Sequence, residues 1–293
     1  SAPNLVALAT TSIGVTLNAA IFARDNITIN GASNSNQGID ASVNITSTNG
    51  NVAMKGDTKA TIGVYHVAGN VVTANNITIN GASIDAPGWV TQIAGLTINS
   101  SAVGGSIIVT GNVIGTPGAA GGIYQTGTIT GANGSNISFT SNNDISQNGA
   151  VVLATNTSGS AANIVYDTST GNKTSSIVSG TLTIASSGST SAINYTVKSA
   201  GAALNPGLIG TSAIVLPGAI TIDNTFGGTA GAGGTPVSGF VSASANNLVA
   251  LATTSIGVTL NAAIFARDNI TINGASNSNR GIDASVNITS TNG

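Results

Sequence analysis

The chain has 293 residues, of which only seven are basic and nine are acidic, and its formal net charge is −2. This balance excludes the basic surface that nucleic acids attract and the polybasic patch that anionic membranes attract. The lack of cysteine excludes disulfides and cysteine metal sites, and a hydrophobic fraction of 41% argues against a disordered chain.

Residue usage favours strands over helices. All nine acidic residues are aspartate, and Ser, Thr, Asn, Gly, Ala, Ile and Val dominate in place of the usual helix formers. Beta-branched residues separated by Gly and Asn are typical of short strands joined by tight turns. The composition therefore predicts an all-β protein.

The first predicted element is the uncharged stretch Leu5–Ala23, whose nineteen residues would be long enough to span a bilayer. It contains several Thr, Ser, Gly and Asn residues, and it recurs at Leu248–Ala266. A signal peptide does not recur inside a chain, and it begins with Met and a basic segment. We interpret the stretch as strands, without membrane insertion.

This recurrence belongs to a longer repeat. Asn4–Gly50 matches Asn247–Gly293 at every position except one, where Gln37 stands against Arg280. The offset is 247 − 4 = 243 residues. We predict that residues 1–243 form one long tandem-repeat unit, that residues 244–293 begin the next, and that the chain is a window from a longer array.

Apolar clusters also recur at a shorter period. "ITIN" at Ile77–Asn80 is followed by "LTIN" at Leu96–Asn99, an offset of nineteen, and Ile27 is followed by Ile45 at eighteen. Such a period predicts one coil of a β-helix, built of two or three strands. We expect a single elongated, right-handed parallel β-helix with coils of about 18–19 residues. The 243-residue unit would then be about thirteen coils, or about 62 Å long.

The fold predicts how side chains divide between inside and outside. Ile27 and Ile29 would enter a core column, and asparagines would form ladders along the outside of the stack. Asn-Gly pairs would turn the corners with positive φ. These pairs are Asn30-Gly31, Asn49-Gly50 and Asn133-Gly134. Met54–Lys59 and Gly201–Gly239 are expected to be loops or less regular coils.

Few residues are candidates for chemistry. Arg24-Asp25, repeated at Arg267-Asp268, is the best charged pair, but strand neighbours point to opposite faces, which favours a surface role. His66 is the only histidine and Trp89 the only tryptophan, and we interpret both as structural. Asn-x-Ser/Thr sequons are interpreted as strand pattern rather than as glycosylation sites. These begin at Asn26, Asn44, Asn76, Asn136 and Asn194, among others.

No nucleophile elbow, phosphate loop, zinc-protease or EF-hand motif occurs. We therefore predict no catalytic, cofactor-binding or metal-binding residue, no cofactor and no enzyme activity. The partners expected are neighbouring repeats, other copies of the chain in fibres, and a cell-surface or glycan receptor.

The repeat style resembles that of filamentous haemagglutinin-like exoproteins of Gram-negative bacteria. The segments that carry the resemblance are "NITIN", "VNITSTNGNV", "SNISFTSNNDI" and "GTLTIASSG". The resemblance implies a giant β-helix exported by two-partner secretion to the cell surface, with a role in adhesion, aggregation or biofilm formation. It carries no binding residue over to this chain.

Two alternatives stay open. β-Helices also include polysaccharide lyases, whose sites need clustered carboxylates with a basic residue. Ice-binding solenoids need a TxT motif on one face of every coil. TxT occurs here at irregular offsets, at Thr126–Thr128, Thr155–Thr157 and Thr181–Thr183.

Overall fold

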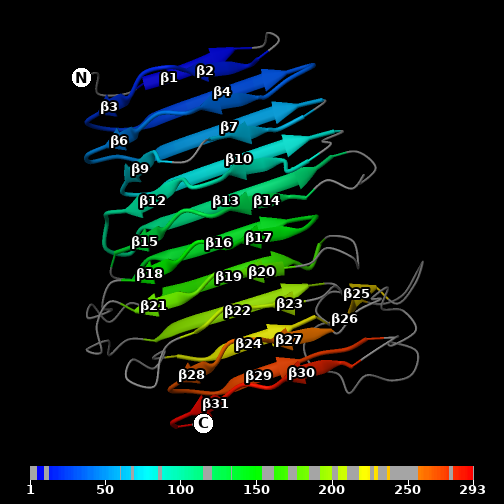
Figure 1. Cartoon of the computed structure of the whole chain (residues 1–293). Helices are drawn as coiled ribbons and strands as arrows, with labels where there is room; N and C mark the ends of the chain where they lie inside the picture. The colour runs from blue at the N-terminus through cyan, green and yellow to red at the C-terminus, as the bar shows by residue number, and fades with distance from the viewer. Residues whose placement is uncertain are drawn as a thin grey trace.

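The chain folds into a stack of β-coils, seen from the side in Figure 1. The computed structural model describes residues 5–9, 13–59, 61–66, 69–84, 88–114, 121–132, 134–153, 162–170, 177–184, 192–199, 204–209, 218–224, 228–229, 236–237, 257–276 and 280–292. These residues form strands, turns and connecting segments, and no helix occurs among them. The all-β prediction is confirmed.

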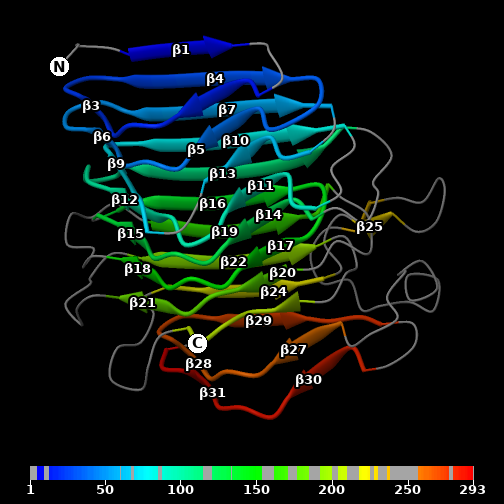
Figure 2. The same cartoon turned by 45° about the horizontal axis from the view of Figure 1, so that its top comes forward.

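Three parallel sheets form the sides of the stack, so each complete coil contributes one strand to each sheet. Figure 2 shows the strands of the second side crossing in front of those of the first. Sheet A has the longest strands. Its order is β1 (Leu5–Ala9), β4 (Ile27–Ser33), β7 (Val52–Thr58), β10 (Ile77–Ser83), β13 (Ser106–Val113), β16 (Asn136–Ser141), β19 (Ala162–Thr168), β22 (Ile193–Ser199), β24 (Ile220–Asp223) and β29 (Ile270–Asn273).

Sheets B and C close the triangle. Sheet B contains β2 (Val15–Leu17), β5 (Ile39–Ala41), β8 (Val64–Tyr65), β11 (Thr91–Ile93), β14 (Ile123–Gln125), β17 (Ile145–Gln147), β20 (Ile177–Ser179), β23 (Leu204–Asn205), β27 (Val258–Leu260) and β30 (Ile282–Ala284). Sheet C contains β3 (Ile21–Ala23), β6 (Ile45–Ser47), β9 (Val71–Ala74), β12 (Thr97–Ser100), β15 (Ile129–Gly131), β18 (Val151–Leu153) and β21 (Leu182–Ile184).

The third side continues beyond β21. Bridges through Ile209 connect Leu182 to Ile264, which begins the pair of strands β28 (Ile264–Ala266) and β31 (Ile288–Ser290). A short antiparallel pair, β25 (Gly228–Thr229) with β26 (Pro236–Val237), is separate from the three sides.

The core is a set of in-register columns. Ile27, Val52, Ile77 and Ile107 are aligned on neighbouring strands of sheet A, and all four are fully buried. Alternation along each strand sends every second side chain inward, so like residues stack on like at about 4.8 Å. The resulting apolar column is the main stabilising feature of the stack. The predicted single parallel β-helix is confirmed, while its handedness and the division at residue 243 stay predictions.

The predicted coil length was wrong. Side-chain hydrogen bonds between equivalent positions of neighbouring coils give the true separation. Asn76 bonds to Asn51 across 25 residues, and Asn194 bonds to Asn163 across 31 residues. The step from β24 to β29 is longer, since Asn273 bonds to Asp223 across 50 residues. The regular coils are therefore about half as long again as the sequence period suggested.

The short period has a structural meaning of its own. Ile27 lies on β4 and Ile45 on β6, which are the first and third sides of the same coil. "ITIN" at Ile77–Asn80 and "LTIN" at Leu96–Asn99 likewise belong to sheets A and C of one coil. In these pairs of strands from sheets A and C, apolar residues face inward and Asn or Thr face outward, so two sides of one coil resemble each other as closely as successive coils do.

One of the two loop predictions also needs correction. Met54–Lys59 was expected to leave the coil, but Val52–Thr58 is the regular strand β7, with Met54 fully buried. Gly201–Gly239 was expected to form loops or less regular coils, and its described residues β23, Ile209 and β24 do pair with the stack, at a less regular spacing. The segment also includes the short pair of β25 with β26. Residues 206–208, 218–219 and 224 are also described, and the rest of that segment lies outside the described residues.

The glycine of Asn30-Gly31 serves close packing rather than a turn. Gly31 lies inside β4 and does not have a positive φ, nor does Gly50 of the second predicted pair. A Cβ at Gly31 would collide with the carbonyl oxygen of Gly38, where the chain enters sheet B. The backbones meet too closely here for any side chain. Gly134, with φ near 70°, does adopt the predicted turn conformation, while Asn133 lies outside the described residues.

Candidate functional site

Arg24 and Asp25 form an ion pair at a bend. They follow β3, and the Arg24 Nη2 lies 2.9 Å from the Asp25 Oδ2. The expectation that these neighbours point apart was wrong, because the bend replaces strand alternation at this corner. The hydrogen bond from Arg24 lowers the pKa of Asp25, and Arg267 lowers the pKa of Asp268 in the same way.

His66 lies in the core. Its side chain is fully buried, and its Nε2 is 3.0 Å from the carbonyl oxygen of Val43. Val43 precedes β6 on the neighbouring coil, so this hydrogen bond connects two coils. The position agrees with the structural role expected for this histidine.

Trp89 packs against the coil that follows it. Its ring centroid is 5.5 Å from that of Tyr124, and a Cβ at Gly121 would overlap the indole ring. The indole is half-buried. Trp89 therefore covers the end of sheet B, as expected of a structural aromatic.

Several buried polar side chains are hydrogen-bonded to one another inside the stack. The Gln147 Nε2 donates to the Gln125 Oε1 (2.8 Å), and the Tyr166 hydroxyl donates to the Gln147 Oε1 (2.8 Å). Tyr195 bonds to Ser179 at 2.6 Å, and the ring of Tyr166 stacks on Phe139 at 5.0 Å. Burial raises the pKa of both tyrosines, so both hydroxyls stay protonated and hydrogen-bonded. Nothing in the sequence pattern indicated this network.

An asparagine ladder runs along one edge of sheet A. The backbone N–H of Asn51 donates to the Asn26 Oδ1 (2.9 Å), and the Asn76 Nδ2 donates to the Asn51 Oδ1 (2.7 Å). Lower in the stack, the Asn163 Nδ2 donates to the Asn136 Oδ1 (3.1 Å). The predicted ladder is confirmed. Several sequon asparagines therefore use their amides to hold successive coils together.

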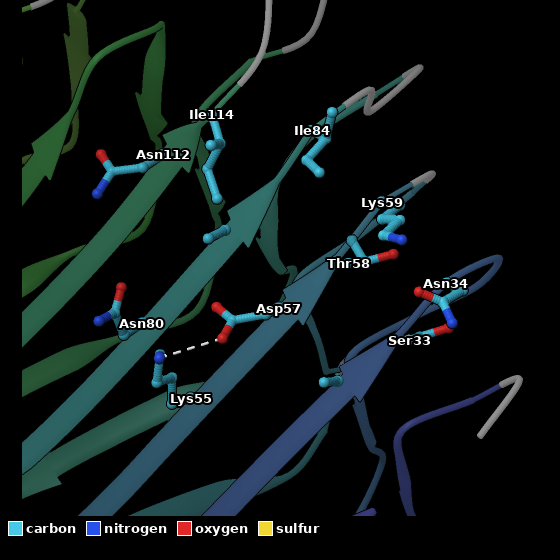
Figure 3. A pocket seen from close by; sticks show the side chains of 12 residues that line it. Ser33, Asn34, Lys55, Asp57, Thr58, Lys59, Asn80, Ile84, Asn112 and Ile114 are labelled. Carbon is cyan, nitrogen blue, oxygen red and sulfur yellow. Dashed lines mark ion pairs between the residues drawn. The ribbon is translucent and has the colours of Figure 1, made fainter. Parts of the chain in front are cut away.

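Sheet A carries an open groove, with a volume of about 690 Å³. Side chains from four consecutive strands and the residues after them converge on it (Figure 3). Lys55 and Asp57 form an ion pair of 3.1 Å in the groove. The lining residues are Ala32, Ser33, Asn34, Lys55, Asp57, Thr58, Lys59, Asn80, Ala82, Ile84, Asn112 and Ile114. The sequence prediction missed this groove, because it took "MKGDTK" for a loop.

Two other kinds of feature are absent from the residues that the structure describes. They contain no group of three or more His, Cys, Asp or Glu side chains placed to hold a metal ion. The same part of the chain has no helix long and apolar enough to cross a membrane.

Comparison with known proteins adds no name to the fold. No family model, no curated protein and no solved structure matches the chain. The chain is a parallel β-solenoid repeat protein on the strength of its own sheets and its own internal repeat.

Proposed function

We propose that this chain is part of a stiff β-helical filament or stalk of a secreted bacterial surface protein, which serves adhesion, aggregation or biofilm formation. The observation that carries the proposal is the ten-strand, in-register stack of sheet A, in which copies of one sequence recur at β4 and β29. A rod of this kind gains length with every copy, and weak contacts repeated along it sum to avidity.

Sequence style supports the same proposal. The strands and turns resemble those of filamentous haemagglutinin-like exoproteins, for which a location at the cell surface and two-partner secretion are expected. In this proposal the chain is not an enzyme, and its partners are neighbouring repeats, other copies of the chain and a surface receptor.

The test uses arrays of one, two and three 243-residue units displayed on bacterial cells that lack other adhesins. β29 lies eight strands after β4 in sheet A, so each unit adds about 38 Å of rod at the sheet spacing. We expect filament length and cell attachment to rise in steps with unit number. Attachment that does not depend on unit number would contradict the proposal.

The two alternatives have direct tests of their own. Turnover of an acidic polysaccharide that disappears when one unit is removed would favour a lyase. Thermal hysteresis of the purified chain would favour ice binding. Ile129 is aligned with Val151 and Val151 with Leu182. The residues before these three are Thr128, Ala150 and Thr181, so an alanine stands between the two TxT motifs in the stack. Thr155–Thr157 lies outside the described residues.

A further inference from the structure

The groove on sheet A is hollow because two of the four residues on its floor are alanines. Ala32, Asp57, Ala82 and Asn112 are aligned on four neighbouring strands and face outward. The two alanines leave space between taller neighbours. The resulting volume of about 690 Å³ lies within the range of ligand sites in proteins.

The two rims of the groove differ in chemistry. Lys55 and Asn80 stand on one side, in aligned positions of β7 and β10. On the other side, Lys59, Ile84 and Ile114 follow the ends of their strands (Figure 3). Ile84 is 42% exposed and Ile114 is 64% exposed, so this rim is an apolar ledge beside a cation.

Charge in the groove is unbalanced towards positive. Five of the cations in the described residues, at positions 24, 55, 198, 267 and 280, have an aspartate within ion-pair distance. Lys59 has no such carboxylate among the described residues, and its side chain is exposed at the rim. Exposed ion pairs such as Lys55–Asp57 contribute little to folding stability. A bound anion can therefore contact Lys55 with little loss of stability, even if the ion pair with Asp57 is weakened.

We propose that this groove binds a linear acidic polysaccharide. Its carboxylate or sulfate groups would accept hydrogen bonds from Lys59 and Lys55, and its hydroxyl groups would bond to Asn80 and Asn112. The C–H face of a sugar ring would pack on Ile84. This inference rests on the proposed adhesive function, for which it names a ligand class.

Other polyanions and small anions fit the groove less well. None of the residues that line the groove is an aromatic on which a nucleic-acid base could stack, so a single-stranded nucleic acid would gain only its contacts with the lysines. A free inorganic anion would use the lysines but not the exposed isoleucines. The groove is also open along the stack over four strands, which suits an extended chain better than a compact ligand.

The experiment measures binding of the whole chain to polygalacturonate, with heparin as the sulfated probe and dextran as the neutral one. Lys59→Gln and Lys55→Gln should each weaken binding about two- to five-fold, and Asp57→Asn should strengthen it, because Lys55 is released from its partner. Added salt should weaken binding, since the contacts are exposed. Ile84→Ala should weaken binding to the polysaccharide without changing its salt dependence.

Arg280→Gln is the matched control. It removes one positive charge outside the groove and restores the residue that stands at position 37 of the first copy. We expect it to leave binding unchanged. The inference is overturned if this variant weakens binding as much as Lys59→Gln does, if dextran binds as well as polygalacturonate, or if single-stranded DNA binds more tightly than both acidic glycans.

The two proposals can fail separately. If filament length and cell attachment rise with unit number while neither acidic glycan binds, only the ligand proposed for the groove is wrong. If glycan binding depends on Lys59 while cell attachment does not change with the number of units, only the proposed adhesive function is wrong.

Discussion

Two nearly identical segments of the chain occupy different environments. Ile39 and Ile45 in the first copy are fully buried, whereas the matching residues of the second copy, Ile282 and Ile288, are 42% and 43% exposed. β5 and β6 each pair with strands on both sides, while β30 and β31 each pair with one strand among the described elements. The difference shows that the apolar side chains of a coil are buried only where further coils stack on it.

At the other edge of each copy the difference is reversed. Val258 and Leu260 of the second copy are 0% and 2% exposed, because β23 covers β27. The equivalent Val15 and Leu17 lie on β2, which is the first strand of sheet B, and Leu17 is only half-buried. Identical residues are thus core or surface according to their place in the stack.

Local contacts, in contrast, are the same in both copies. The Arg24–Asp25 pair and the Arg267–Asp268 pair both close at 2.9 Å. Ser290 donates to the backbone oxygen of Asp268, as Ser47 does to that of Asp25. Contacts made within one bend, or between two adjacent coils of the same copy, are therefore the same in both copies, although the two copies have different neighbours.

The largest expected contrast comes from one substitution made in each copy. Ile39→Ala should lower the free energy of unfolding by about 2–5 kcal/mol, since it leaves a cavity in a filled column. Ile282→Ala should cost about 1 kcal/mol or less, since much of that side chain already meets solvent. Urea denaturation of both variants measures the difference. Equal costs would show that the exposed isoleucine is covered in solution.

The contrast should disappear when the missing neighbour is supplied. Residues 51–76 cover β5 and β6 in the first copy, so appending the same sequence after Gly293 should cover β30 and β31. In the extended chain, Ile282→Ala should then cost about 2–5 kcal/mol, as Ile39→Ala does. A scrambled extension of the same composition is the control and should leave the cost at its original value.

A smaller contrast is expected in the asparagine ladder. Asn26 accepts a hydrogen bond from the backbone of Asn51, while its counterpart Asn269 is exposed and has no side-chain hydrogen bond among the described residues. Asn26→Ala should cost about 0.5–1 kcal/mol, whereas Asn269→Ala should cost nearly nothing. Urea denaturation again reports both values. A measurable loss of stability on Asn269→Ala would mean that the Asn269 side chain is also hydrogen-bonded in solution.

The smallest effect should be alike in both copies. Arg24 lowers the pKa of Asp25, and Arg267 lowers that of Asp268, so each pair stabilises the fold above the ordinary aspartate pKa of 3.8. This contribution is lost as the pH falls through the lowered folded-state values. NMR titration should find both carboxyls below 3.8, and Arg24→Gln should raise the pKa of Asp25 alone. A shift of Asp268 in that variant would contradict the local origin of the effect.

Sequence reasoning predicted the parallel stack, the apolar columns and the asparagine ladder. All three follow from strand alternation. Whether a residue such as Ile or Asn faces inward or outward depends only on its place in its own strand, and not on the coil stacked above it. Sequence reasoning failed at the coil length, since Ile27 and Ile45 look like successive coils but are two sides of one. It also missed the groove, whose alanine floor and charged rim come from strands of four successive coils.

The sequence by itself determined which side chains of a strand face inward, because strand alternation depends only on neighbours within a few residues. Only the tertiary structure decided how many residues complete a coil, which lysine lacks a carboxylate among the described residues, and whether an isoleucine is buried. Those properties depend on strand register between coils, and register is set by the whole column of contacts rather than by any one segment. The same forty-seven-residue sequence, apart from one position, is therefore core in one place and surface in another.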